Sequence, residues 1–190
     1  MNRLPFISLF LVLLLSCSSK KKKTPKDSAH YFPVLPFLMS QAQQIDSAMY
    51  GFILIRTQGN RRDTMDISRE DARRYANDFI SIPDLRDSKH GSDYAELSTF
   101  DSVVGKVLIS YTAEEQGLEL NRQDVTIVPG FGQEDRIETV YLEKIIEDDD
   151  STVEKKMLWE TGKYFQIRTI VQKKNTPDRV ENLKVAWKSF

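Results

Sequence analysis

The chain has 190 residues, and its 27 Lys and Arg side chains nearly balance its 28 Asp and Glu side chains. A neutral chain of this length fits one domain or two small ones and is a poor candidate for nucleic-acid binding, which needs a basic surface. With one Cys and two His, a disulfide framework and a Cys- or His-rich structural zinc site are both excluded. We expect neither a metal site nor a cofactor.

An apolar segment near the N-terminus predicts export. Residues 1–3 give a short basic start and residues 4–15 are almost wholly apolar, which is the pattern of a secretory signal peptide. About twelve helical residues rise only about 18 Å, which is short of the ~30 Å hydrocarbon core of a bilayer. We therefore do not expect this segment to be a transmembrane helix.

The apolar segment ends in Leu14-Leu15-Ser16-Cys17, which resembles the lipobox of bacterial lipoproteins. The resemblance implies that residues 1–16 are a lipoprotein signal peptide and that Cys17 carries a lipid anchor with acyl chains such as palmitate. Because several acyl chains on one residue hold a protein stably on a bilayer, the membrane is the first expected partner. An ordinary signal peptide followed by a chance cysteine is the alternative.

The residues after Cys17 predict a tether and a location. Residues 17–30 are rich in Ser and Lys, so we expect a disordered tether with an r.m.s. span of roughly 20 Å. Ser18 in place of an aspartate resembles lipoproteins released to the outer membrane, which implies attachment there, facing the periplasm. The lysines at 20–23 either lie against anionic headgroups or are solvated.

Residues 31–190 are predicted to form a single globular α+β domain, because no second linker divides them. They carry 21 basic and 27 acidic side chains, a net charge of −6, which favours solubility and disfavours binding to nucleic acid. The first predicted element is a helix that begins near Pro33, with apolar residues three or four apart as far as Met49. Two short strands over residues 50–56 and 63–67 follow, joined by a hairpin turn.

A second helix is predicted between Ser68, whose side chain is a suitable N-cap, and Pro83. Beyond it the apolar period changes to two, and the breaks are too short for crossover helices, so neighbouring strands are antiparallel. In the last third, three predicted strands have mostly apolar side chains at every second position and polar ones between them. The residues on the apolar side are Val153, Met157 and Trp159 in the first strand, Phe165, Ile167, Thr169 and Val171 in the second, and Leu183, Val185 and Trp187 in the third. We predict two N-terminal helices packed on a mainly antiparallel sheet of six to nine strands that is meander-like in its C-terminal half.

Short patches at both ends of this domain also resemble an uncharacterised family of lipoproteins from Gram-negative bacteria. The patches are residues 31–47 at the start of the domain, and residues 156–159 followed by 165–172 near its end. The resemblance implies a lipid-anchored envelope domain and assigns it no activity.

Aromatic side chains are the candidate contacts for a ligand or partner. Phe131 lies between two glycines, so it is either presented by a bending loop or packed into the end of the sheet. Trp159, Tyr164 and Trp187 are expected to form an aromatic cluster, which is either core or the wall of a ligand cavity. The acidic run at 148–150 fits no calcium motif, and a solvated hairpin tip is predicted there.

Three functions fit these features. The first is a lipid-anchored, non-enzymatic envelope domain that binds an envelope protein or a small apolar ligand on its sheet. The second is a periplasmic hydrolase or lyase that uses carboxylates, which predicts at least two acids converging in a pocket with perturbed pKa values. The third is a structural role in envelope assembly, which predicts neither. No catalytic residue is assigned, because the chain lacks the common hydrolase, nucleotide-binding and metalloprotease motifs.

Overall fold

A computed structural model of the chain describes residues 31–130 and 132–188. The predicted signal peptide, Cys17, the tether and Phe131 lie outside the described residues. The helices are α1 (Val34–Ser47), α2 (Arg69–Ile80) and the short α3 (Ser88–Gly91). The strands are β1 (Phe52–Gln58), β2 (Arg61–Ile67), β3 (Tyr94–Asp101), β4 (Lys106–Ala113), β5 (Leu120–Val128), β6 (Arg136–Asp148), β7 (Ser151–Glu160), β8 (Tyr164–Lys173) and β9 (Thr176–Trp187).

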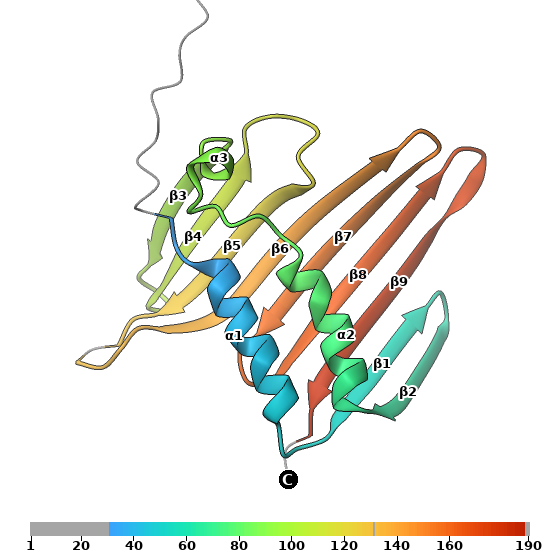
Figure 1. Cartoon of the computed structure of the whole chain (residues 1–190), viewed down its shortest axis with the longest axis horizontal. Helices are drawn as coiled ribbons and strands as arrows, with labels where there is room; N and C mark the ends of the chain where they lie inside the picture. The colour runs from blue at the N-terminus through green and yellow to red at the C-terminus, as the bar shows by residue number, and fades with distance from the viewer. Residues whose placement is uncertain (1–30, 131, 189–190) are drawn as a thin grey trace, which may run out of the picture.

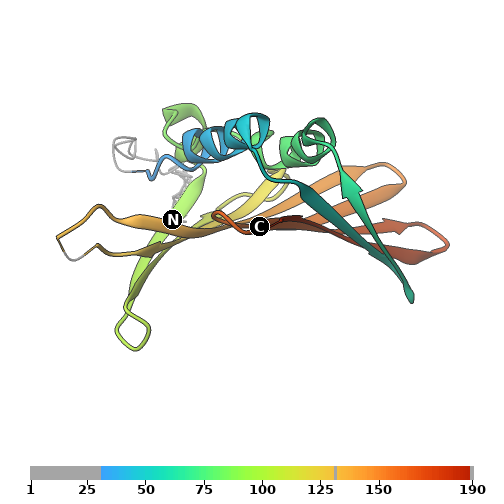
Figure 2. The same cartoon turned by 90° about the horizontal axis from the view of Figure 1, so that it is seen from below.

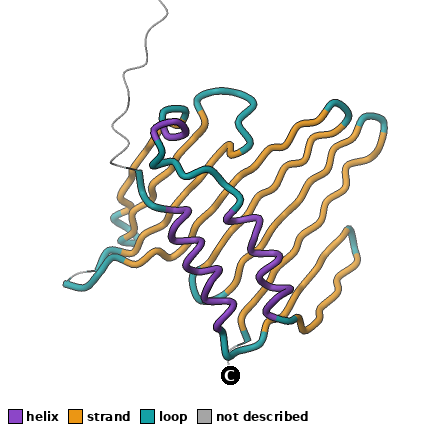
Figure 3. The backbone as a smooth tube through the Cα atoms, in the orientation of Figure 1, coloured by secondary structure: helices purple, strands orange, loops and turns teal. Residues whose placement is uncertain are grey.

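All nine strands form one antiparallel sheet in the order β2-β1-β9-β8-β7-β6-β5-β4-β3. Strands β3 to β9 are sequential neighbours, and β1 adds the first hairpin to the free edge of β9. Figure 3 shows that most loops join the strands at the two ends of the sheet, as a meander requires. The predicted antiparallel sheet of six to nine strands is therefore confirmed.

The helices differ from the predicted N-terminal pair. Only α1 precedes the sheet, because α2 follows the β1–β2 hairpin, and α3 was not predicted. Strand β3 was also missed, since most of its residues are exposed on both faces and carry no apolar alternation. Val103 lies in the turn between β3 and β4.

Both α1 and α2 lie on the same face of the sheet, and they contact each other along their length (Figures 1 and 2). Each helix buries one stripe of apolar residues: Val34, Leu38, Ala42 and Ile45 on α1, and Ala72, Ala76 and Phe79 on α2. No described helix lies on the opposite face, which we call the open face.

The core lies between this helix layer and the sheet. Met157, Trp159, Phe165, Ile167, Leu183 and Val185 are buried there, which confirms the predicted parity of β7, β8 and β9. Phe79 of α2 packs edge-on against Trp159 with ring centroids 5.2 Å apart, and Trp159 stacks on Phe165 at 5.0 Å. These contacts join α2 to the middle of the sheet.

The N-cap of α2 is the one predicted. The Ser68 hydroxyl accepts a hydrogen bond of 3.0 Å from the backbone N–H of Asp71. Replacing Ser68 with alanine leaves that N–H without its acceptor, so we expect the free energy of unfolding to fall by about 1 kcal/mol. Urea unfolding followed by circular dichroism measures this. An unchanged midpoint for Ser68→Ala, with an unchanged slope, would show that the cap contributes no stability.

The hydroxyls of three tyrosines join the first described residues to α3 and β4, and β3 to β5. The Tyr31 hydroxyl donates to the carbonyl of Gly91 at 2.6 Å, and the Tyr111 hydroxyl accepts from the backbone N–H of Phe32 at 2.8 Å. The Tyr94 hydroxyl donates to the carbonyl of Leu120 at 2.7 Å. Burial raises the pKa of both Tyr94 and Tyr111 to about 12, because the phenolate would lose its hydration.

These shifted pKa values predict a loss of stability in alkali. Below pH 10 both tyrosines are protonated in the folded and unfolded states. From about pH 10 to 12 the unfolded chain releases these protons while the folded chain keeps them. We expect each tyrosine to destabilise the fold by roughly 1.4 kcal/mol per pH unit in this window.

Unfolding free energies measured between pH 8 and pH 12 test this prediction. Tyr94→Phe leaves the carbonyl of Leu120 without its donor, so it starts about 1–3 kcal/mol less stable. It should then lose less stability than the parent above pH 10. A decline as steep as that of the parent would exclude Tyr94 as a source of the alkaline effect.

Candidate functional site

The open face carries a shallow groove of about 630 Å³ that crosses the strands β1, β2 and β6 to β9. We call it the basic groove. Its polar and charged lining residues are Thr57, Arg62, Lys156, Gln166, Arg168, Asn182 and Lys184. They project from the open face because, on β7, β8 and β9, they alternate with the buried core residues.

Strand register brings the cations of the groove together. Lys156 on β7 lies directly opposite Arg168 on β8, and Lys184 on β9 lies opposite Gln166 of β8. Opposite residues in an antiparallel pair have Cβ atoms about 4.5–5.5 Å apart, so Lys156 and Arg168 repel one another. All the charged residues that line the groove are basic.

Two of these cations have no counter-ion within the described part of the chain. Neither Arg62 nor Arg168 makes an ion pair of 4.0 Å or less with any described residue. Lys156 lies 2.7 Å from a carboxylate oxygen of Glu154, and this hydrogen bond raises the pKa of Lys156. The ammonium of Lys184 lies over the ring of Tyr164, 3.5 Å from its centroid, which is a cation–π contact.

The floor of the groove is partly apolar. Ile55 of β1, Tyr141 of β6 and Leu158 of β7 line it between the polar residues. The Tyr141 hydroxyl lies 3.1 Å from an oxygen of Glu143, and burial raises the pKa of Tyr141 to about 12. Tyr141 is therefore a neutral donor at physiological pH, already directed to Glu143. The groove combines an apolar floor with cationic sides.

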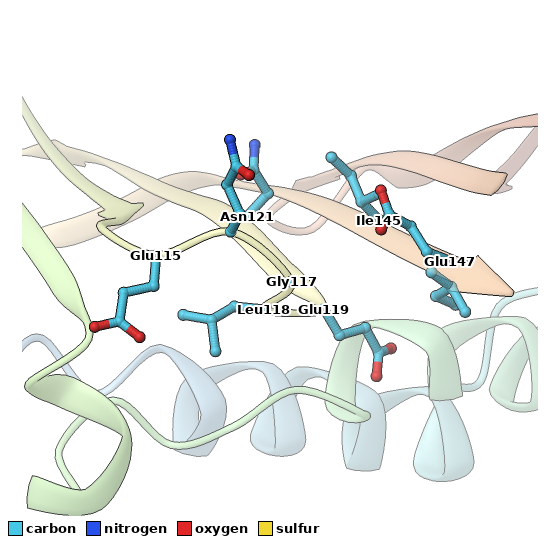
Figure 4. A pocket seen from close by; sticks show the side chains of 9 residues that line it. Glu115, Gly117, Leu118, Glu119, Asn121, Ile145 and Glu147 are labelled. Carbon is cyan, nitrogen blue, oxygen red and sulfur yellow. The ribbon is translucent and has the colours of Figure 1, made fainter.

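A second hollow, of about 710 Å³, lies beside the β4–β5 loop and the end of β6 (Figure 4). Its lining is acidic, with Glu115 and Glu119 from the β4–β5 loop and Glu147 from β6. The carboxylates of Glu115 and Glu119 lie apart and do not converge on one point (Figure 4). Glu119 pairs with the buried ammonium of Lys144 at 2.5 Å. Lys144 also donates to the carbonyl of Ser81 just after α2, where a cation stabilises the helix end.

The carboxyl groups with shifted pKa values do not have the character that a general acid requires. The carboxyl groups whose pKa clearly departs from its usual value are Glu70, Asp84 and Glu160, and all three are lowered. A general acid needs a raised pKa. Within residues 31–130 and 132–188, no three His, Cys, Asp or Glu side chains are grouped so as to hold a metal ion.

The aromatic residues singled out in the sequence separate in the structure. Trp159 is fully buried in the core beside Trp187, with ring centroids 6.1 Å apart, and so contributes packing. Tyr164 has the opposite parity on β8 and lies on the open face, in contact with Lys184 next to the basic groove. The expected cluster of Trp159, Tyr164 and Trp187 is therefore wrong in one member. Phe165, not Tyr164, packs against the two tryptophans.

Phe131 itself is outside the described residues, but the backbone beside it is closely packed. A Cβ atom on Gly130 would overlap the carbonyl oxygens of Gln133 and Glu134, so this position requires glycine. The Gly130 N–H donates to a carboxylate oxygen of Asp135 at 3.0 Å. The role of Phe131 in contacting a partner stays a prediction.

Comparisons with known proteins add no further assignment. None of the described helices combines the length and the apolar character needed to span a bilayer. No protein-family model, no curated protein and no solved structure matches this chain.

Proposed function

We propose that this protein is a lipid-anchored binding domain of the bacterial cell envelope, without enzymatic activity, that holds an amphiphilic anion in the basic groove. The observation that carries the proposal is the charge of the groove. Its charged lining residues are all basic, although the domain as a whole has 27 acidic against 21 basic side chains. A cationic site on an acidic domain selects anions and concentrates them locally.

The shape of the groove supports an elongated ligand. It crosses the sheet from β2 to β6, which at about 4.8 Å per strand is a span of roughly 24 Å. The apolar floor at Ile55 and Leu158 suits a hydrocarbon body, and Arg62 and Arg168 suit an acidic headgroup such as a phosphate or carboxylate. This ligand class deepens the earlier expectation of a small apolar envelope ligand.

The lipid anchor is proposed on the lipobox-like sequence at Cys17. It places the domain on the outer membrane, facing the periplasm, and brings it close to a source of amphiphilic molecules. Labelling with radioactive palmitate tests the anchor. We expect label in the parent chain and none in Cys17→Ala, and label retained in Cys17→Ala would contradict acylation at this residue.

A binding experiment tests the groove. Every described element and contact lies within residues 31–188, so a fragment of residues 28–190 keeps them all and is free of the anchor. We expect calorimetry to show that dodecyl phosphate binds this fragment at least tenfold tighter than dodecanol, which has the same chain and no charge. That ratio corresponds to about 1.4 kcal/mol. Inorganic phosphate, which lacks the chain, should bind weakly.

Two results would contradict the proposal. Equal affinities for dodecyl phosphate and dodecanol would show that the cations contribute nothing. Equal affinities for dodecyl phosphate and inorganic phosphate would show that the apolar floor contributes nothing.

A further inference from the structure

The turn between β3 and β4 exposes aliphatic side chains at its tip. Val103 is 92% exposed and Val104 is 58% exposed. Leu97, Phe100 and Leu108, on the two strands behind the turn, are also exposed. Because side chains alternate between the two faces of a strand, Leu97 and Leu108 lie on one face of the hairpin and Phe100 on the other. We call Val103 and Val104, at the end of the hairpin, the apolar hairpin tip. Isolated exposed apolar residues are common, but two neighbouring valines exposed at the end of one hairpin require an explanation.

The other short turns of the sheet differ in composition from the β3–β4 turn. The tips of the β1–β2, β6–β7, β7–β8 and β8–β9 hairpins are built from Gly59-Asn60, Asp149-Asp150, Thr161-Gly162 and Lys174-Asn175, which are polar residues or glycine. Such residues are normal in turns because they accept the required backbone angles and are well hydrated. In contrast to these four turns, the β3–β4 turn places two valines in solvent.

The valines are held outward by the turn itself. One carboxylate oxygen of Asp101 accepts hydrogen bonds from the backbone N–H groups of Val103, at 2.9 Å, and Val104, at 3.3 Å. Gly105 has a positive φ of 65°, which a valine would not adopt readily. Because the backbone is fixed, the side chains are not free to fold back onto the sheet.

The position and shape of the tip favour a lipid surface as its occupant. In Figure 2 the β3–β4 hairpin projects from the sheet on the side opposite the helices. The tip is convex, so a protein partner would need a matching pocket, whereas a bilayer accepts a small apolar projection of any outline. Just behind the tip, the ammonium of Lys106 lies 2.6 Å from a carboxylate oxygen of Glu138. These charged groups and Asp101 would lie at the level of the lipid headgroups when the tip is inserted.

The length of chain before the fold allows the tip to reach a bilayer. The first described residue, Tyr31, contacts the start of β3 through the carbonyl of Tyr94. The eight residues of β3 carry the hairpin roughly 27 Å further. Residues 18–30 extend to at most about 45 Å, so an anchor at Cys17 leaves the tip within range of the same membrane.

We propose that the apolar hairpin tip inserts into the bilayer as a second membrane contact. The proposal rests on the anchor of the proposed function for proximity alone, and it does not depend on the basic groove. Insertion turns the open face toward the bilayer, because the hairpin projects on that side. An amphiphilic anion leaving the membrane would then enter the groove directly.

Site-specific fluorescence tests the insertion. The full chain carrying Val103→Trp is reconstituted with an excess of phosphatidylcholine vesicles, and the emission of the parent chain, from buried Trp159 and from Trp187, is subtracted. We expect brominated acyl chains to quench the added indole at least twofold and aqueous iodide to have little effect. Asp149→Trp, at the exposed β6–β7 tip, is the matched control and should show the reverse.

A second variant tests whether the apolar character of the tip causes the insertion. Adding Val104→Asp to Val103→Trp should reduce quenching by the brominated chains to the level of the control. Unreduced quenching would overturn the proposal, as would an indole at position 103 that iodide reaches as freely as in the control. An indole shielded from iodide but unquenched by the brominated chains would mean that a second copy or another protein covers the tip. Flotation of the vesicles reports separately on the anchor at Cys17.

Discussion

Replacing Trp159 with alanine should lower the free energy of unfolding by about 3–5 kcal/mol. The indole is fully buried and contacts Phe79, Phe165 and Trp187, with ring centroids 5.0 to 6.1 Å away. Its removal leaves a cavity at the point where α2 meets the middle of the sheet. Since domains are stable by only about 5–15 kcal/mol, this single change removes a large part of the total. Urea unfolding followed by circular dichroism measures it.

Trp159→Phe is the matched control. The Trp159 Nε1–H has no hydrogen-bond acceptor among the described residues, so the phenyl ring loses volume but no polar contact. We expect a loss of less than half that of Trp159→Ala. If alanine cost less than about 1 kcal/mol, Trp159 would not be part of the core. If phenylalanine cost as much as alanine, the N–H would have an acceptor in solution.

The double substitution Arg168→Glu and Lys184→Glu reverses two charges in the basic groove. It should weaken the binding of dodecyl phosphate about 100-fold. Each substitution removes an attraction and adds a repulsion, each of which is worth up to about 1 kcal/mol at an exposed site. A total of about 2.8 kcal/mol corresponds to that factor. The loss should shrink at high salt, because exposed charges are screened. Calorimetry on the fragment of residues 28–190 measures both.

The control for this pair makes the same change in net charge elsewhere. Arg74 on α2 and Lys174 at the β8–β9 tip are exposed and do not line the groove. Arg74→Glu with Lys174→Glu should alter the affinity less than threefold. Equal losses for the two pairs would show that the net charge of the domain, rather than the groove, controls binding.

Local sequence patterns predicted the elements in which one face is buried. The α2 helix follows from an N-cap at Ser68 and from apolar residues at helical spacing, and both features are local. Strands β7, β8 and β9 follow from strict alternation, because each packs one face on the helices and exposes the other. Where both faces are exposed, as in β3, the alternation disappears and the strand was missed.

The basic groove could not be predicted, because it exists only through strand register. Lys156 and Arg168 are twelve positions apart and become neighbours when β7 pairs with β8. Arg62 joins them from β2, since the β1–β2 hairpin pairs with the last strand of the sheet. The alternation in β7, β8 and β9 did predict that the polar side chains of these strands face solvent. The absence of acidic residues from the groove lining, however, depends on which pairs the sheet aligns.

The most direct test of the groove as a ligand site is to map the contact residue by residue. Amide resonances of the ¹⁵N-labelled fragment of residues 28–190 are followed while dodecyl phosphate is added. We predict saturable shifts on β1, β7, β8 and β9, around Ile55, Lys156, Arg168 and Lys184, and unchanged resonances on the outward faces of α1 and α2. Shifts confined to the hollow near Glu119, or no saturable shifts at all, would contradict a ligand site on the open face.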